Sequence, residues 1–310
     1  MTTATLPASA RDTARPRRRK PKGGGLVAWA FALPALVVYV VFLVYPALQS
    51  LWFSFTDWDG LSATYDFVGL DNYAKMPKDP VVIQALINNA IWTIVTITVP
   101  VIIGLLLAIL LNGKVRGKPV LRLIFYTPAV MPLVAVASIW GWLYNPQYGA
   151  INEFLRAIGL GALAQPWLGQ NSTALAAVMV PAIWLRVGFP MLLYLAALQG
   201  INTDMYEAAT VDGATKWQQF WFITMPSLKP AHYIVIALSL IDSFKVFDLI
   251  YAMTYGGPGT ATQVMGTWMY FNVFQYYQAG YGTAIAVVIT VIAIAVSIPY
   301  VRSQTKEAQS

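Results

Sequence analysis

The stretch YEAATVDGATKWQQFWFITMPSLKP, at residues 206–230, is polar, yet it lies between two strongly apolar stretches at about 172–199 and 230–255. A helix that crosses a bilayer needs about 20 predominantly apolar residues, and both flanking stretches are long enough. A polar segment between two such helices is expected outside the hydrocarbon core. Residues 206–230 therefore indicate an all-α integral membrane protein that carries a folded polar element between two spans, where a soluble partner can act on it.

The composition of the whole chain fits a bilayer better than water. Hydrophobic residues make up 58% of the 310 residues, charged residues only 11%, and the mean hydropathy is +0.59. A soluble domain with so few charges would not stay dispersed. The apolar stretches predict six transmembrane helices within a domain at 26–301, at about 26–53, 82–111, 120–143, 172–199, 230–255 and 281–301.

Basic residues predict how the chain is oriented. Residues 1–25 are rich in Pro, Gly, Ala and Arg, so we expect a disordered basic segment that faces anionic lipid on the cytoplasmic side. Further basic residues lie in the turn at 112–119 and in the tail at 302–310, whereas the predicted external segments carry few. We expect both termini to be cytoplasmic. The net charge of +7 then reflects membrane contact and gives no support to nucleic-acid binding.

Residues 200–229 predict a hairpin of two short helices. Asn202 or Thr203 can cap the first helix, whose early turns carry acidic residues that favour a helix N-terminus. Gly213 permits a tight turn between the helices. Pro226 and Pro230 are expected to end the second helix and to redirect the chain into the next span. Such a hairpin presents a rigid knob that can fit into a groove of a partner protein.

The hairpin resembles the EAA motif of ATP-binding-cassette (ABC) importer permeases, the membrane subunits of those transporters. Met225 stands where that pattern has Leu, a substitution that conserves volume and apolar character. The runs at 67–73 (FVGLDNY) and 247–258 (FDLIYAMTYGGP) resemble elements of the sugar-permease branch, which is related to the maltose transporter. The residues that match the EAA motif are Glu207, Ala208, Ala209, Gly213, Ile223 and Pro226.

This resemblance implies the type I ABC importer permease fold, and it implies that the hairpin at 200–229 couples the spans to a separate ATPase. It also implies a bacterial plasma membrane, a second homologous permease subunit, a dimer of ATP-binding-cassette ATPases and an extracytoplasmic solute-binding protein that delivers a sugar. The chain lacks the phosphate-binding pattern G-x-x-x-x-G-K-[ST], so ATP and Mg²⁺ are expected on the partner ATPase, and no cofactor is expected here.

Charged residues inside the predicted spans are candidates for the substrate path, because each costs roughly 2.5–3.5 kcal/mol to insert. Asp242, Lys245 and Asp248 recur at intervals of three, which would place them on one face of the fifth span, within reach of Arg186 in the fourth. They either line the path of the cargo or form an internal ion-pair network. The sequence leaves both interpretations open.

Aromatic rings are the second group of candidates, because sugars stack their apolar faces on rings while polar groups bind their hydroxyls. Trp184, Tyr194 and Phe244 are available on the fourth and fifth spans, and Trp140 on the third. Other aromatic residues near span ends, such as Trp142, Tyr144 and Tyr255, are typical of an interfacial belt.

Two other functions are less well supported by the residues. A self-sufficient secondary transporter or channel is the alternative, but the sequence has no visible inverted repeat. A membrane-embedded enzyme would need reactive groups, yet the chain has no Cys and a single His, His232, which is expected to be an interfacial residue and not a catalytic one.

Overall fold

The computed structural model describes residues 24–307, and the described residues form helices and loops with no β-strand, only an isolated bridge between Thr56 and Phe67. Residues 1–23 and 308–310, and with them the prediction of a disordered N-terminus, lie outside the described part. Two compact units divide the chain after Gln49. The first contains α1 (Gly24–Tyr39), a π-helical turn at Val40–Val44 and the beginning of α2 (Tyr45–Phe53).

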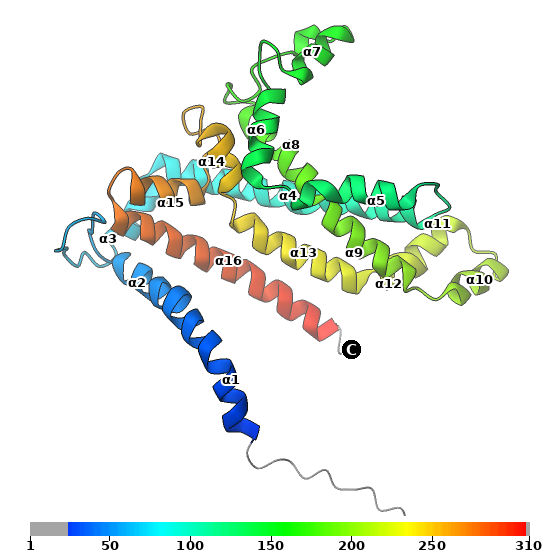
Figure 1. Ribbon diagram of the computed structural model, residues 1–310, viewed down its shortest axis with the longest axis horizontal. Coiled ribbons are helices and arrows are strands. Elements are labelled where there is room, and N and C mark those ends of the chain that lie inside the picture. Colours follow the sequence, from blue (N-terminus) through cyan, green and yellow to red (C-terminus); the bar gives the residue numbers. More distant parts are fainter. Residues whose placement is uncertain (1–23, 308–310) are drawn as a thin grey trace, which may run out of the picture. The chain divides into compact units, whose positions relative to one another are not determined.

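Helix α4 (Pro80–Asn112) is the central helix of the second unit, where it contacts α8, α9, α13 and α15 (Figure 1). Asp79 caps its N-terminus by accepting hydrogen bonds from the backbone N–H groups of Val81 and Val82. Gly104 allows close approach of α9, because a Cβ at this position would lie 2.7 Å from the Pro190 Cβ. Small residues at such crossings are common in membrane helix packing.

The second unit has two other long helical stretches besides α4. One is α8 (Ala174–Arg186) followed directly by α9 (Gly188–Gln199), and the other is α16 (Ala279–Glu307). Helix α16 runs beside α13 (Lys229–Phe244) and packs against α15 (Met265–Phe274) (Figure 1). Within residues 24–307, four helical stretches are long and apolar enough to cross a membrane, or five if one bent pair counts as a single span.

The bent pair corrects the prediction of a simple third span at 120–143. Helix α5 (Lys118–Tyr126) continues through a 3₁₀ turn at Thr127–Val130, and α6 (Leu133–Leu143) leaves at an angle of 102° to that segment. Pro132 precedes the first residue of α6 and lies in an extended conformation. A proline disfavours helix in the residue before it and donates no backbone hydrogen bond, so the chain turns at this point.

The fifth predicted span, at 230–255, is also interrupted. Helix α13 ends at Phe244, and α14 (Asp248–Thr254) begins after a break at 245–247. Gly266 on α15 lies against the break, since a Cβ there would approach the carbonyl oxygen of Val246 to 2.8 Å. Because neither piece reaches the length of a span alone, six transmembrane helices stay a prediction.

Short helices lie in the segments that connect the spans. One is α3 (Asp71–Lys75), followed by a 3₁₀ turn at Met76–Lys78. Another is α7 (Ala150–Ala157), which precedes a 3₁₀ turn at Gly161–Leu163. The loop between α14 and α15 is held by α4. Asn88 donates to the carbonyl oxygens of Ala261 (3.0 Å) and Gln263 (2.7 Å), and Asn89 accepts from the Met265 N–H at 2.8 Å.

Candidate functional site: a polar hairpin and a charged cavity

The polar stretch forms the hairpin expected from its sequence. Helix α10 (Thr203–Val211) begins after Asn202, whose side chain accepts a hydrogen bond from the Asp204 N–H at 3.0 Å. Gly213 turns the chain at φ +81°. Helix α11 (Lys216–Gln219) starts with a capping box in which Thr215 and Gln218 satisfy each other's backbone N–H groups. Local capping rules therefore define both helix starts.

Hydrogen bonds between the two arms hold the hairpin together. The hydroxyls of Tyr206 and Thr224 lie 2.9 Å apart, and Thr224 is buried. The Gln219 amide donates to the Thr210 hydroxyl at 2.9 Å. A rigid element transmits force between a partner and the spans better than a flexible loop, and these bonds link helix α10 to the arm that leads into α13.

The second arm differs from its prediction. Pro226 and Pro230 do not end a helix, because α11 continues through a π-helical turn at Phe220–Thr224 into α12 (Met225–Ser227). Pro226 lies in the first turn of α12 and Pro230 in the first turn of α13. The first turn of α13 tolerates Pro230, because the N–H that a proline lacks would have no partner there in any case.

The residues of the EAA motif lie mostly on the surface of the hairpin. Glu207, Ala208, Gly213 and Pro226 are exposed, while Ala209 and Ile223 are half-buried. Large apolar side chains are exposed beside them, a combination that is common in surfaces that bind other proteins. These side chains and their exposed fractions are Met205 49%, Val211 88%, Trp217 69%, Trp221 47% and Phe222 78%.

The charged residues of the predicted substrate path converge on a cavity of about 360 Å³. Arg186 comes from the end of α8, Asp242 from α13, Lys245 from the break and Asp248 from the first turn of α14. The break means that the last three do not share one helical face, as their spacing had suggested, but they still meet at one site. Volumes of this size are typical of small-ligand pockets.

Two positive and two negative side chains line this cavity, so their formal charges sum to zero, but none of them forms a close ion pair with another. Within the described residues the one ion pair shorter than 4.0 Å joins Arg156 and Glu153, far along the chain from this cavity. Unpaired charges are costly in a dry, apolar environment, so water or a polar ligand must solvate the cavity. No cluster of three or more His, Asp or Glu side chains suited to a metal ion occurs within residues 29–300, where the side chains are described.

None of the four aromatic candidates, Trp140, Trp184, Tyr194 and Phe244, lines this cavity. Tyr194 is fully buried in the cluster where α9 packs, and its hydroxyl lies 2.9 Å from Nδ1 of His232. Phe244 lines a different cavity, between α4 and α16. Trp184 is 38% exposed, and its ring packs edge-on against the ring of Trp140 with the two centroids 6.0 Å apart.

Other residues that line the charged cavity were not predicted from the sequence, including Trp92, Met131 and Phe247. Trp92 is 1% exposed, and its indole N–H has no hydrogen-bond partner among the described residues. Trp92 is a single Trp within the long apolar run of α4, and no sequence pattern marks it as a cavity residue. Phe247, in contrast, begins the run at 247–258 that resembles the sugar-permease branch.

Comparisons with known proteins agree with the helical architecture. The sequence profile of the family described as "Binding-protein-dependent transport system inner membrane component" matches residues 100–305. The probable ABC transporter permease protein YurN of Bacillus subtilis is 37% identical over 275 residues, which cover 88% of this chain and 94% of YurN. The multiple sugar-binding transport system permease protein MsmF of Streptococcus mutans is 33% identical, over 90% of this chain and 95% of MsmF.

A solved structure has the same fold. A chain in the crystal structure of a bacterial alginate ABC transporter, in complex with an alginate pentasaccharide-bound periplasmic protein, superposes with a TM-score of 0.78 at 24% identity. The match covers 89% of this chain and 92% of that chain. From its sequence, its helices and these relatives, the chain belongs to the family of inner-membrane components of binding-protein-dependent transport systems, as an ABC-importer permease and not an enzyme.

Proposed function

We propose that the chain is the permease subunit of an importer that moves a carbohydrate across a bacterial plasma membrane, driven by ATP hydrolysis on a separate subunit. The hairpin of α10–α12 receives the motion of that ATPase, and the charged cavity lies on the route of the cargo. The observation that carries the proposal is the hairpin itself, an internally bonded polar element whose exposed surface combines the EAA motif with large apolar side chains.

The hairpin is well placed for this role. It lies at the end of α13 opposite to the break that contributes Lys245 to the cavity (Figure 1). A displacement of the hairpin would therefore act on the cavity through one helix of 16 residues. Glu207 offers a charge and Ala208 a small surface to a groove in the ATPase, and the neighbouring Met205 and Trp217 offer apolar area.

A carbohydrate cargo is supported by the names of the relatives and by the chemistry of the cavity. MsmF is named for multiple sugar-binding transport, and its match extends over nearly the whole of both chains. Carboxylates and cationic side chains together can accept and donate hydrogen bonds to many hydroxyl groups. The balanced charge of the cavity suits a neutral polyhydroxylated molecule better than an anionic one.

The rest of the assembly follows from membership in the family. A second, homologous permease completes the pathway, two ATPase subunits bind ATP and Mg²⁺, and an extracytoplasmic solute-binding protein delivers the cargo. Both termini and the hairpin face the cytoplasm. The description of the family names a binding protein as part of such systems, which supports the last of these partners.

The test is uptake by the complete transporter after a change in the hairpin. Glu207→Lys reverses an exposed charge and should abolish ATP-driven uptake and loosen the association with the ATPase, while the chain still inserts into the membrane. Lys216→Glu, which also reverses an exposed charge on the hairpin but lies outside the EAA motif, is the matched control and should retain most uptake. Normal uptake and normal ATPase co-purification with Glu207→Lys would refute the coupling role, and uptake without ATP would favour a secondary transporter.

The cavity is tested separately by Arg186→Leu, which removes one of its two cations. We expect reduced flux with the ATPase still bound. Normal flux would mean that the cavity is not on the route of the cargo.

A further inference from the structure

A second cavity, of about 390 Å³, lies beside the external ends of α6 and α8, and neither the sequence motifs nor the coupling mechanism accounts for it. The side chains of Trp140, Tyr144 and Trp167 line it together with the hydroxyl-bearing Ser172 and Thr173. The ring centroids of Trp140 and Tyr144 are 5.6 Å apart, and those of Tyr144 and Trp167 are 6.3 Å apart. We call this the aromatic cavity.

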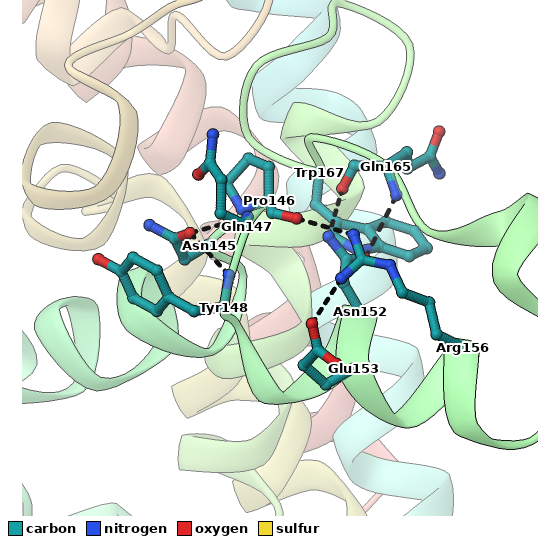
Figure 2. Close-up of polar contacts among 9 residues, drawn as sticks. All are labelled: Asn145, Pro146, Gln147, Tyr148, Asn152, Glu153, Arg156, Gln165 and Trp167. Atoms are coloured by element: carbon teal, nitrogen blue, oxygen red, sulfur yellow. Dashed lines mark hydrogen bonds and ion pairs between the residues drawn. The ribbon is translucent and has the colours of Figure 1, made fainter.

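The external segment holds Trp167 in place at the aromatic cavity (Figure 2). Asn152 on α7 is 1% exposed, and its side-chain oxygen accepts a hydrogen bond from the Trp167 indole N–H at 2.8 Å. Its amide donates to the Gln165 carbonyl oxygen at 3.0 Å. Arg156 adds a bond of 3.0 Å to the Pro146 carbonyl oxygen. The ring of Trp167 is therefore fixed by a bonded scaffold and is not loosely attached.

Tyr144 does not occupy the interfacial belt expected from its position in the sequence, because it is only 6% exposed, whereas Trp142 is 62% exposed and fits such a belt. The Tyr144 hydroxyl has no hydrogen-bond partner among the described residues, and neither has the Trp140 indole N–H or the Ser172 hydroxyl. Burial raises the pKa of Tyr144 to about 12, so the hydroxyl keeps its proton at neutral pH. The cavity thus combines three ring faces with unused hydrogen-bonding groups.

We propose that the aromatic cavity is an external subsite for one pyranose ring of the cargo, which stacks on Trp140 and Trp167 and hydrogen-bonds to the hydroxyl of Tyr144. A pyranose has apolar C–H faces and a rim of hydroxyls, which matches ring faces bordered by polar groups. The Tyr144 hydroxyl can both donate a hydrogen bond to a hydroxylated ligand and accept one from it. The proposal rests on the carbohydrate transport proposed above.

A lipid chain fits the aromatic cavity less well. Acyl chains offer no hydrogen-bonding group, so the hydroxyl of Tyr144 would stay unsatisfied. The ring of Trp140 also contacts the ring of Trp184 on α8, with the two ring centroids 6.0 Å apart.

The experiment uses the absence of Cys from this chain, which makes any introduced thiol unique. Ser172→Cys places a thiol at the aromatic cavity of the full chain in lipid nanodiscs, where both faces are open to reagents. The rate of maleimide labelling is measured with and without 10 mM methyl glucoside, methyl galactoside or methyl mannoside, with sorbitol as the osmotic control. If the cavity binds at least one of these pyranosides with a Kd of about 1 mM, that pyranoside should slow labelling of the thiol about tenfold.

Matched variants separate stacking from general effects. Trp140→Ala in the Ser172→Cys background should remove the protection, whereas Trp142→Ala, an exposed Trp two residues away that does not line the cavity, should leave it intact. Tyr144→Phe should weaken protection by about threefold to tenfold, as expected for one hydrogen bond. A thiol at Gln147→Cys, exposed on the same external segment but outside the cavity, should not be protected.

The subsite would be overturned if none of the pyranosides protected the thiol at position 172 from maleimide. It would also be overturned if the protection persisted in the Trp140→Ala variant. Protection by decanoate but not by pyranosides would overturn it too, and would identify an acyl-chain pocket. Because labelling needs neither ATP nor partners, it is independent of transport. Carbohydrate uptake without protection would contradict the subsite alone, whereas protection without ATP-driven carbohydrate uptake would contradict the proposed function alone.

Discussion

Gly213 is the residue on which the geometry of the hairpin depends most directly. Its φ of +81° lies in the left-handed region, but a Cβ there would meet no atom within 4 Å, so the backbone alone disfavours another residue. Gly213→Val should destabilise the turn by about 1–2 kcal/mol and so increase hydrogen exchange of the amides of 203–227 about five- to thirtyfold. Gly213→Asn should change it much less, because Asn tolerates this conformation.

Gly117 provides the control for that prediction. It has a φ of +78° and equally open surroundings, but it lies in the turn before α5. Gly117→Val should leave exchange in the hairpin unchanged. Equal exchange in the Gly213→Val and Gly213→Asn variants would mean that the turn does not depend on the glycine.

At the scale of single residues, the sequence predicted what depends on near neighbours and missed what depends on tertiary packing. Asn202 and Gly213 act where capping and turn rules place them. Tyr194 was expected on the substrate path but packs against His232, and Trp92 was not considered although it lines the charged cavity. An apolar run shows that a Trp or Tyr lies in a helix, but not which neighbour its ring will meet.

At the scale of elements, α4 determines the position of the loop between α14 and α15. Asn88→Ala would remove the donor to the buried Gln263 carbonyl oxygen and to the half-buried Ala261 carbonyl oxygen. A cost of about 1–3 kcal/mol is expected, and the Tm of the purified chain should fall by several degrees. Gln84→Ala, which removes only a half-buried contact to Asn88, should have a smaller effect. Equal losses in the two variants would contradict the role given to Asn88.

Helices α4 and α9 form a second element-scale contact, at Gly104. Gly104→Ala forces a Cβ to within 2.7 Å of the Pro190 Cβ and 2.9 Å of the Met191 nitrogen, so we expect destabilisation of about 1–3 kcal/mol. Gly141→Ala in α6, where a Cβ would meet nothing within 4 Å, should be neutral or stabilising because Ala favours helix. Thermal unfolding followed by tryptophan fluorescence measures both. A stabilising Gly104→Ala would show that the helices are not in close contact.

The interruptions of the spans mark the limit of prediction at this scale. The spacing of Asp242, Lys245 and Asp248 is compatible with a continuous helix, so it gave no sign of the break that separates α13 from α14. The third span was expected to be continuous over 120–143, so its bend of 102° was not predicted. Both features depend on what packs against them, such as Gly266 at the break. The sequence could still predict that the charges gather, because buried charges require a common polar environment.

At the scale of the whole molecule, the account requires that work done on the hairpin by a separate ATPase reaches the charged cavity through α13. The most direct measurement is cross-linking in the assembled transporter. One thiol is placed at Val211→Cys, which is 88% exposed on the hairpin, and a control thiol at Tyr148→Cys, which is 59% exposed between α6 and α7. The account predicts that a short bifunctional reagent links residue 211, and not residue 148, to the ATPase. A cross-link from residue 148 but not from residue 211, or none from residue 211 in a transporter that still hydrolyses ATP and imports its cargo, would contradict it.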